Sequence, residues 1–212
     1  MKIFLLLITL LSTSSQASQF LDWDELESRL KASGGNIKAL RHVQCFMEKG
    51  EKRSFKIKKP TNDAYNNRCY SKSQRSIGLA RTFTLIDYTA SSKKRRMFMI
   101  DRLTGGITTM AAAHGRYESG FFKRRLKHNH NTVKRARYYS NAFGSNAPSS
   151  GFYLTGHEYY GKWDRSLVLH GLEEGINDNA CQRAVVIHGH RLVSKNKARV
   201  MSSGCPMVSK ED

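Results

Sequence analysis

Acidic residues are scarce in this chain. Its 212 residues include only 17 Asp and Glu against 36 Lys and Arg, which gives a formal net charge of +19. A balance of this kind indicates polyanionic surroundings. The zinc-binding patterns HExxH and CxxC are also missing, which disfavours a metal centre. We therefore expect no metal and no cofactor, with a zinc site of His114, His188 and His190 as the alternative.

Beyond the N-terminus, no segment approaches the ~18 consecutive apolar residues that a membrane-spanning helix needs. Residues 1–17 instead have the pattern of a secretory signal peptide: Lys2, an apolar core from Ile3 to Leu11, and Ser15-Gln16-Ala17 as a small-x-small cleavage site. We expect an exported protein of the periplasm or cell envelope. Its polyanionic neighbours are then wall peptides, anionic lipid or polysaccharide, and not nucleic acid; an uncleaved N-terminal anchor is the alternative.

The C-terminal part carries a base and a nucleophile. A short run of apolar residues, 184–187, has β-branched side chains and predicts a buried strand that ends at His188 and Gly189. Fourteen residues after His188 begins the sequence Ser202-Ser203-Gly204-Cys205. A thiol attacks only as the thiolate, so a catalytic Cys requires a partner such as an imidazole. A core cysteine and an ordinary strand-end histidine are the plain alternative.

The periodicity changes along the chain. Residues 20–35 predict a short helix, with Asp22 as N-cap, Glu25 three residues later and two glycines at the end. Residues 36–50 repeat the helical pattern, and 51–76 form a polar connector. From residue 78 short strands of period two follow, with a turn at 103–106. This pattern predicts a mainly β sandwich or barrel with a small N-terminal helical appendage, divided as signal peptide 1–17, helical segment and connector 18–77, and catalytic domain 78–212.

Four cysteines in an exported chain indicate disulfide bonding. If Cys205 stays a thiol, one more cysteine is left unpaired. We expect Cys45 to pair with Cys69, since both lie in the N-terminal appendage, and Cys181 to stay free. A Cys181–Cys205 disulfide that blocks the nucleophile is the alternative.

Several blocks of the sequence resemble the catalytic domain of the L,D-transpeptidases, the cysteine enzymes of bacterial peptidoglycan. The likeness is to the subgroup with Ser-x-Gly-Cys-Pro and runs from about residue 78 to 208. It implies a β-rich catalytic fold. The blocks are TLIDYTASSKKRRMFMID at 84–101, AAHGRYESG at 112–120, YYSNAFGSNAPSSGFYLTGHEYYGK at 138–162, SLVLHGLEEGINDNA at 166–180, and RAVVIHG with SSGCP.

The resemblance also implies roles for individual residues. Cys205 attacks the carbonyl between the third, L-configured centre and the terminal D-Ala of a tetrapeptide stem, and His188 activates the thiol. The Gly189 carbonyl orients the imidazole, and backbone amides around Ser203, Gly204 and Cys205 hold the tetrahedral oxyanion. The candidate substrate contacts are Arg183, Tyr159, Tyr160 and His170.

The resemblance leaves three functions open. Transfer of the acyl group to the amine of a second stem makes a 3-3 crosslink, and transfer to water makes the protein an L,D-carboxypeptidase. Family members usually continue through a short helix and a closing strand, whereas only seven residues follow Cys205 here. The third interpretation is therefore a C-terminally truncated, non-catalytic wall-binding protein. The basic run 120–139, an insertion relative to the family pattern, is either a solvated loop or a tether to an anionic wall or membrane surface.

Overall fold

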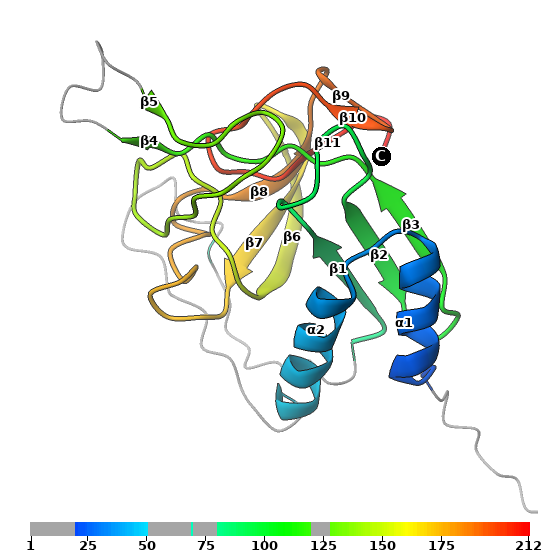
Figure 1. Ribbon diagram of the computed structural model, residues 1–212. Coiled ribbons are helices and arrows are strands. Elements are labelled where there is room, and N and C mark those ends of the chain that lie inside the picture. Colours follow the sequence, from blue (N-terminus) through cyan, green and yellow to red (C-terminus); the bar gives the residue numbers. More distant parts are fainter. Residues whose placement is uncertain (1–19, 51–68, 70–79, 120–127) are drawn as a thin grey trace, which may run out of the picture.

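A computed structural model describes residues 20–50, 69, 80–119 and 128–212. The described part is mainly β, with two helices, as we expected (Figure 1). The helices are α1 (Trp23–Ala32) and α2 (Ile37–Gly50).

The strands form two sheets and two short pairs. One sheet has the order β1-β2-β3, with β1 Thr82–Ile86, β2 Met97–Asp101 and β3 Ile107–Met110. A second has the order β11-β8-β7-β6, with β6 Tyr153–Gly161, β7 Asp164–Gly171, β8 Val186–Gly189 and β11 Met207–Val208. Two short pairs complete the set, β4 (Glu118–Ser119) with β5 (His128–Asn129) and β9 (Val193–Ser194) with β10 (Lys197–Ala198).

Both predicted helices form and pack against the β1-β2-β3 sheet. The Asp22 carboxylate accepts a hydrogen bond from the Glu25 backbone N–H at 2.7 Å, which confirms Asp22 as the N-cap of α1. Leu30 of α1 and Leu40 of α2 are buried in one cluster with Phe98 and Ile100 of β2. Burial of such side chains contributes about 2 kcal/mol each. The helical appendage is therefore attached to the β structure by an apolar core.

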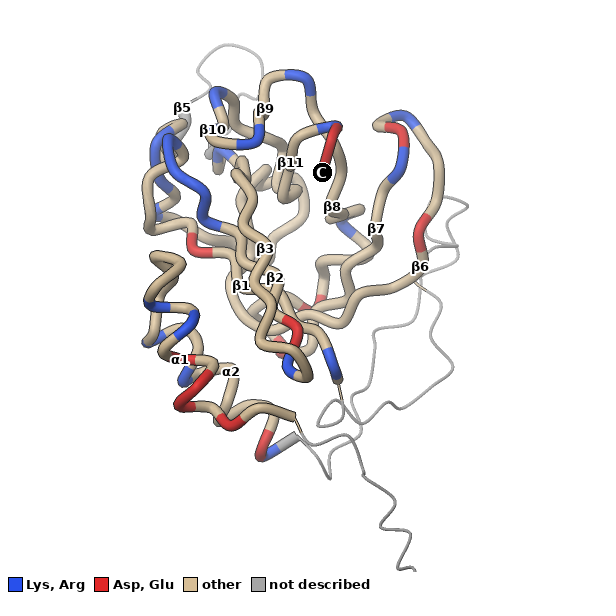
Figure 2. Tube along the Cα trace, turned by 90° about the vertical axis from the view of Figure 1, so that its right-hand side faces the viewer, with Lys and Arg blue, Asp and Glu red and all other residues tan. Residues whose placement is uncertain are grey.

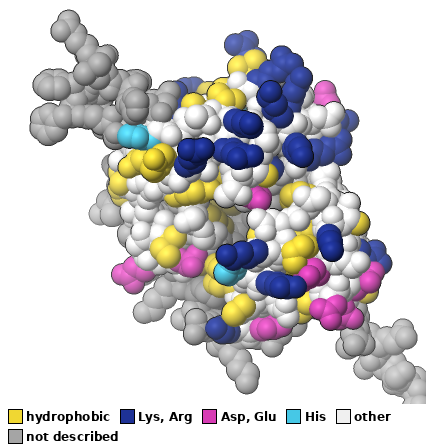
Figure 3. All heavy atoms as spheres, viewed as in Figure 1, with side chains coloured by type: hydrophobic (Ala, Val, Ile, Leu, Met, Phe, Trp, Pro, Cys, Tyr) yellow, Lys and Arg dark blue, Asp and Glu magenta, His cyan; other side chains and the backbone are white. Residues whose placement is uncertain are grey.

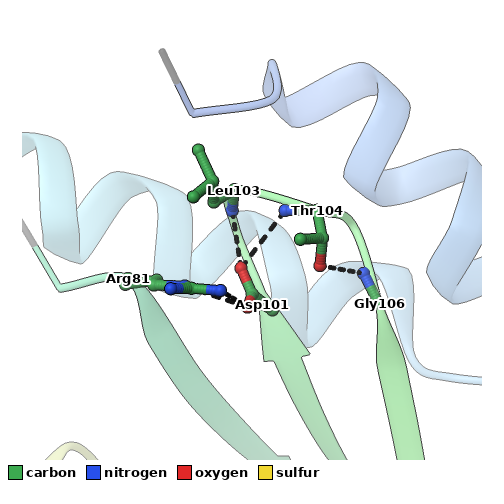
Figure 4. Close-up of polar contacts among 5 residues, drawn as sticks. All are labelled: Arg81, Asp101, Leu103, Thr104 and Gly106. Carbon is green, nitrogen blue, oxygen red and sulfur yellow. Dashed lines mark hydrogen bonds and ion pairs between the residues drawn. The ribbon is translucent and has the colours of Figure 1, made fainter. Parts of the chain in front are cut away.

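The turn predicted at 103–106 joins β2 to β3 (Figure 4). One carboxylate oxygen of Asp101 accepts from the backbone N–H of Leu103 at 2.8 Å and of Thr104 at 3.2 Å, and the other oxygen accepts from the Arg81 guanidinium at 2.7 Å. These bonds, the one to Arg81 first, lower the pKa of Asp101 to about 2. Gly105 has φ +69°, a left-handed conformation that favours glycine.

Alternate residues of β2 serve two cores. Phe98 and Ile100 face the helices, whereas Met97 packs with Met110 and with Val208 of β11. This second cluster also contacts Ile187 of β8. The two sheets are thus joined through an apolar layer, as a sandwich requires.

Strand β8 lies between β7 and β11 and is the centre of the second sheet. It pairs antiparallel with β7, where His188 lies opposite Ser166, and parallel with β11, where His188 lies opposite Met207. The sequence predicted a buried strand ending at His188 and Gly189, and β8 confirms it. The parallel neighbour was not predicted, and it begins two residues after Cys205.

The predicted Cys45–Cys69 disulfide is wrong. Cys69 is bonded to Cys181, across 112 positions of the sequence, and Cys45 is an exposed free thiol on α2. Nearness in sequence misled us because Cys45 lies on the solvent-facing side of its helix, whereas Cys181 lies in the turn before β8. The expectation that Cys181 stays free is therefore wrong as well. Because Cys181 is bonded to Cys69 and Cys205 is a free thiol, the alternative Cys181–Cys205 disulfide is also wrong.

Several sequence-based expectations lie outside the described residues. These are the signal peptide, the connector apart from Cys69, the domain boundary between residues 77 and 78, and residues 120–127 of the basic run. Within the ranges that are described, no helix is long and apolar enough to cross a membrane.

Removing the Cys69–Cys181 disulfide should destabilise the fold. A cross-link over 112 positions restricts the unfolded chain strongly, so Cys181→Ser is expected to lower the free energy of unfolding by about 4 kcal/mol. Urea unfolding measures the change, and Cys45→Ser is the control that should leave stability within about 0.5 kcal/mol. Equal stability of the Cys181→Ser variant and the wild type would contradict this disulfide.

Candidate active site

His188 is held in one orientation by its own strand. Its side chain is buried, and ring atom Nδ1 lies 3.0 Å from the carbonyl oxygen of Gly189. A carbonyl only accepts, so Nδ1 carries the proton and Nε2 is left with a lone pair. Burial lowers the pKa of His188 below its ordinary value. The arrangement gives a neutral imidazole whose second nitrogen can take up a proton.

An aromatic ring also covers His188. Trp163 stacks on the imidazole with the ring centroids 5.2 Å apart and the planes at 24°. It lies in the tight turn between β6 and β7, where Asp164 has φ +62° and forms an ion pair with Lys210 at 2.7 Å. No sequence pattern indicates this contact, because a tryptophan 25 positions upstream reaches the imidazole only through the pairing of β7 with β8.

Cys205 lies two residues before β11, the strand that pairs with β8. The backbone N–H of His188 donates to the carbonyl of Pro206 at 3.3 Å, so the residue after the nucleophile is hydrogen-bonded to the base. The thiol is half-buried and donates to the carbonyl of Ala184, with Sγ 3.5 Å from the oxygen. Burial raises the pKa of the Cys205 thiol, an effect that the Val186 backbone N–H and the charge of Arg183 partly oppose.

The pKa of Cys205 is raised and that of His188 is lowered. Both shifts favour the neutral forms, a thiol and an imidazole, over a thiolate and an imidazolium. General-base chemistry, in which the imidazole takes the thiol proton as the sulfur attacks, is compatible with these neutral forms and stays a prediction.

The turn that carries the nucleophile is organised by Ser202. Its hydroxyl donates to the carbonyl of Cys205 at 2.6 Å and accepts from the N–H of Gly204 at 3.1 Å. Gly204 has φ +121°, a conformation open to glycine. The Gly204 amide that we expected in the oxyanion site thus already has a partner. Ser203 accepts from the Arg116 guanidinium at 2.7 Å through its side-chain oxygen, a partner the sequence did not indicate.

A second glycine allows the chain to pass close behind this turn. Gly115 forms a β-bridge with Ser202, and a Cβ atom at Gly115 would lie 2.8 Å from the Cα of Gly204. Any larger residue at 115 would therefore displace the nucleophile turn or the neighbouring segment 146–148, whose Asn146 carbonyl oxygen would be closer still.

Arg183 is bound by the protein itself. Its guanidinium donates to the carbonyl oxygens of Ser140 at 2.7 Å and Ala147 at 2.8 Å, and to the hydroxyls of Ser145 and Ser149. Burial lowers its pKa. These contacts give Arg183 a structural part in holding the 140–149 loop near Cys205. Its role as a substrate contact stays a prediction.

The other candidate substrate contacts differ in exposure. The side chain of Tyr160 is 82% exposed, near the turn of the β6–β7 hairpin, whereas its neighbour Tyr159 packs against the cluster that includes Cys205. His170 is buried on β7, and its Nδ1 atom has no hydrogen-bond partner in the described part of the chain. Ser166 pairs with His188, and period two places His170 on the same face of the sheet.

Two buried side chains, Arg96 and His114, lie next to the nucleophile turn, since the Ser202 N–H donates to the His114 carbonyl. Arg96 is fully buried and donates to the Ala112 carbonyl at 2.8 Å and to Nδ1 of His114 at 2.7 Å. His114 in turn donates through Nε2 to the Thr132 carbonyl at 3.0 Å. Burial, and then the charge of Arg96, lower the pKa of His114 to about 4. His114 is thus occupied on both nitrogens, and the described residues contain no group of His, Cys, Asp and Glu arranged to hold a metal.

Comparison with known proteins identifies one family. The family model YkuD_2, described as an L,D-transpeptidase catalytic domain, matches residues 53–212. The match includes every candidate site residue and begins before residue 78, the start that the strand pattern suggested. No curated protein and no solved structure matches the chain.

Replacing Arg183 should destabilise the protein. In Arg183→Leu two backbone carbonyls lose their donor, so the free energy of unfolding is expected to fall by about 3 kcal/mol. Urea unfolding measures it, with exposed Arg191→Leu as the matched control, for which a change within about 0.5 kcal/mol is expected. A variant that is as stable as the wild type but inactive would instead favour a substrate contact.

Proposed function

The chain belongs to the L,D-transpeptidase catalytic-domain family, and on this basis we propose that it forms 3-3 crosslinks between peptidoglycan stem peptides through an acyl-enzyme on Cys205. The family is one of cysteine-based L,D-transpeptidases, and its domain implies peptidoglycan peptides as substrates. The observation that carries the proposal is the parallel pairing of β8 and β11, which joins His188 to the residue after Cys205.

In the first half-reaction, Nε2 of His188 takes the proton of the Cys205 thiol as Sγ attacks the carbonyl before the terminal D-Ala. The resulting oxyanion is stabilised by the backbone amides of Ser203 and Cys205, since the Gly204 amide is bonded to Ser202; the contribution is about 3 kcal/mol per donor. The C–N bond then breaks, and the departing D-Ala amine receives the proton from His188. A thioester between Cys205 and the stem remains.

In the second half-reaction, the side-chain amine of a second stem attacks the thioester while His188 accepts its proton. The Cys205 thiolate leaves and takes the proton from His188, and the new amide bond is the crosslink. Water in place of the amine gives the L,D-carboxypeptidase, whose product is a shortened stem. The acceptor alone separates the two activities.

Export and an envelope location are part of the proposal, supported by the pattern of residues 1–17 and by the excess of basic residues. We further propose that the basic run 120–139 attracts the protein to an anionic wall or membrane surface. Arg135 and Arg137 of this run are exposed, which supports that role.

Acylation by a carbapenem tests the proposed nucleophile. The wild type should gain the mass of one carbapenem, because a β-lactam carbonyl acylates an activated active-site thiol. Cys205→Ala should gain none, and Cys45→Ala, which removes the exposed free thiol, should react like the wild type.

The same variants divide the three functions when disaccharide-tetrapeptide is the substrate. Crosslinked dimer supports the transpeptidase, and tripeptide alone supports the carboxypeptidase. Turnover by Cys205→Ala would overturn the mechanism, and a reduced wild type that forms neither adduct nor product would leave only the wall-binding interpretation.

The pH dependence of kcat/KM reports on the base. His188 must be neutral to accept a proton, and burial lowers its pKa below the ordinary value of 6.5. The acid limb of the profile should therefore have its midpoint below pH 6.5, measured between about pH 5 and 9. A midpoint above 6.5 would mean that the charged imidazole is stabilised instead, against the geometry described above.

A further inference from the structure

Three turns, far apart in sequence, are hydrogen-bonded to one another at Ser92. Its backbone N–H donates to the Lys134 carbonyl at 2.9 Å, and its carbonyl accepts from the Ala198 N–H at 2.8 Å. These bonds join residues 91–95, 132–137 and 191–199. We call the Lys and Arg side chains that the three turns expose the basic face. Its members are Lys93, Lys94, Arg95, Lys134, Arg135, Arg137, Arg191, Lys195, Lys197 and Arg199.

The basic face has almost no compensating charge. None of its three segments contains Asp or Glu. Among the described residues, the ion pairs include one from this face, between Lys195 and Glu211 at 3.8 Å. Figure 3 shows the dense group of Lys and Arg side chains across the upper part of the molecule, and Figure 2 shows acidic residues along α1 on the opposite side of the fold. Within the described part of the chain, exposed basic residues are thus gathered on one face.

The scaffold beneath the basic face is ordered by specific contacts. Arg95 donates to the side chain of Asn196 at 3.0 Å and to that of Thr109 at 3.2 Å, which links the first turn to the third. Val193 and Ala198 are buried in a cluster with Met207 of β11. The charges are therefore displayed on a fixed surface, and little conformational entropy is lost when the surface binds a flat partner.

Two apolar side chains are exposed within the same turns. Val133 precedes Lys134 and is 38% exposed, and Leu192 follows Arg191 and is 46% exposed. A soluble polyanion offers charge alone, whereas an anionic bilayer offers headgroup charge and, just beneath it, hydrocarbon. Exposed apolar residues among cations fit the second kind of partner.

We propose that the basic face binds the surface of an anionic phospholipid bilayer, with Lys and Arg at the headgroups and Val133 and Leu192 at the acyl boundary. This interaction is independent of the catalytic reaction, because the basic face contains neither His188 nor Cys205. It goes beyond the attraction proposed for run 120–139, since two of its three turns lie elsewhere in the sequence.

Binding of the full chain to vesicles tests the proposal. Affinities are compared for vesicles of phosphatidylcholine with and without roughly one-third phosphatidylglycerol. The triple variant Lys93→Gln, Lys134→Gln, Lys197→Gln removes one charge from each turn and should bind anionic vesicles about a hundredfold more weakly, at about fivefold per charge.

The matched control is Lys31→Gln, Lys38→Gln, Lys49→Gln, which removes three exposed lysines from the helices and should bind like the wild type. Every variant keeps the same N-terminal segment, so its contribution cancels. Equal affinities of the two triple variants would overturn the proposal.

The apolar part is tested with Val133→Ser, Leu192→Ser. This variant should lose about tenfold in vesicle affinity, which corresponds to two partly exposed apolar side chains, and should bind soluble polyphosphate as the wild type does. If its vesicle affinity is unchanged and polyphosphate competes fully, the basic face is a site for soluble polyanions and the bilayer assignment is wrong. Cys205→Ala should bind vesicles normally, so failure of the catalytic proposal leaves this test intact.

Discussion

The parallel pairing of β8 with β11 is the contact on which the candidate site depends. His188 ends one strand, Cys205 precedes the other by two residues, and the hydrogen bond from His188 to the Pro206 carbonyl fixes their relation. Parallel neighbours require a crossover connection, and here the β9–β10 pair and the nucleophile turn supply it. Displacement of β11 by one residue would turn the Met207 side chain to the other face of the sheet and change the position of Cys205 relative to His188.

Guanidinium groups are structural elements in this protein. Arg96 is buried and Arg183 is half-buried. Both donate mainly to backbone carbonyl oxygens. A planar group with several donors can join chain segments that no regular strand connects. Arg96 joins the segment after β3 to the 132–136 turn through His114, and Arg183 holds the 140–149 loop. A chain with few acidic residues thus stabilises loops near its candidate site with cations.

Much of the fold could be predicted because its determinants are local. The N-cap at Asp22, the turn at 103–106 and the apolar run before His188 are short patterns, and each appears where the sequence placed it. The disulfide could not be predicted, because four cysteines allow several pairings and nearness in sequence favoured Cys45 over Cys181. The contacts of Trp163 with His188 and of Gly115 with the nucleophile turn could not be predicted either. Each acts on a residue that only the folded chain brings near, and no local spacing marks such a contact.

The proposed mechanism requires His188 to be the base for Cys205. A crystal structure of the protein tests it most directly, through the distance between Sγ of Cys205 and Nε2 of His188. We expect about 4 Å or less, a separation that shortens to a hydrogen bond when substrate binds. A separation well beyond that distance, with Nε2 bonded to another group, would contradict the assignment of His188 as the base and favour a protein that binds the wall without catalysis.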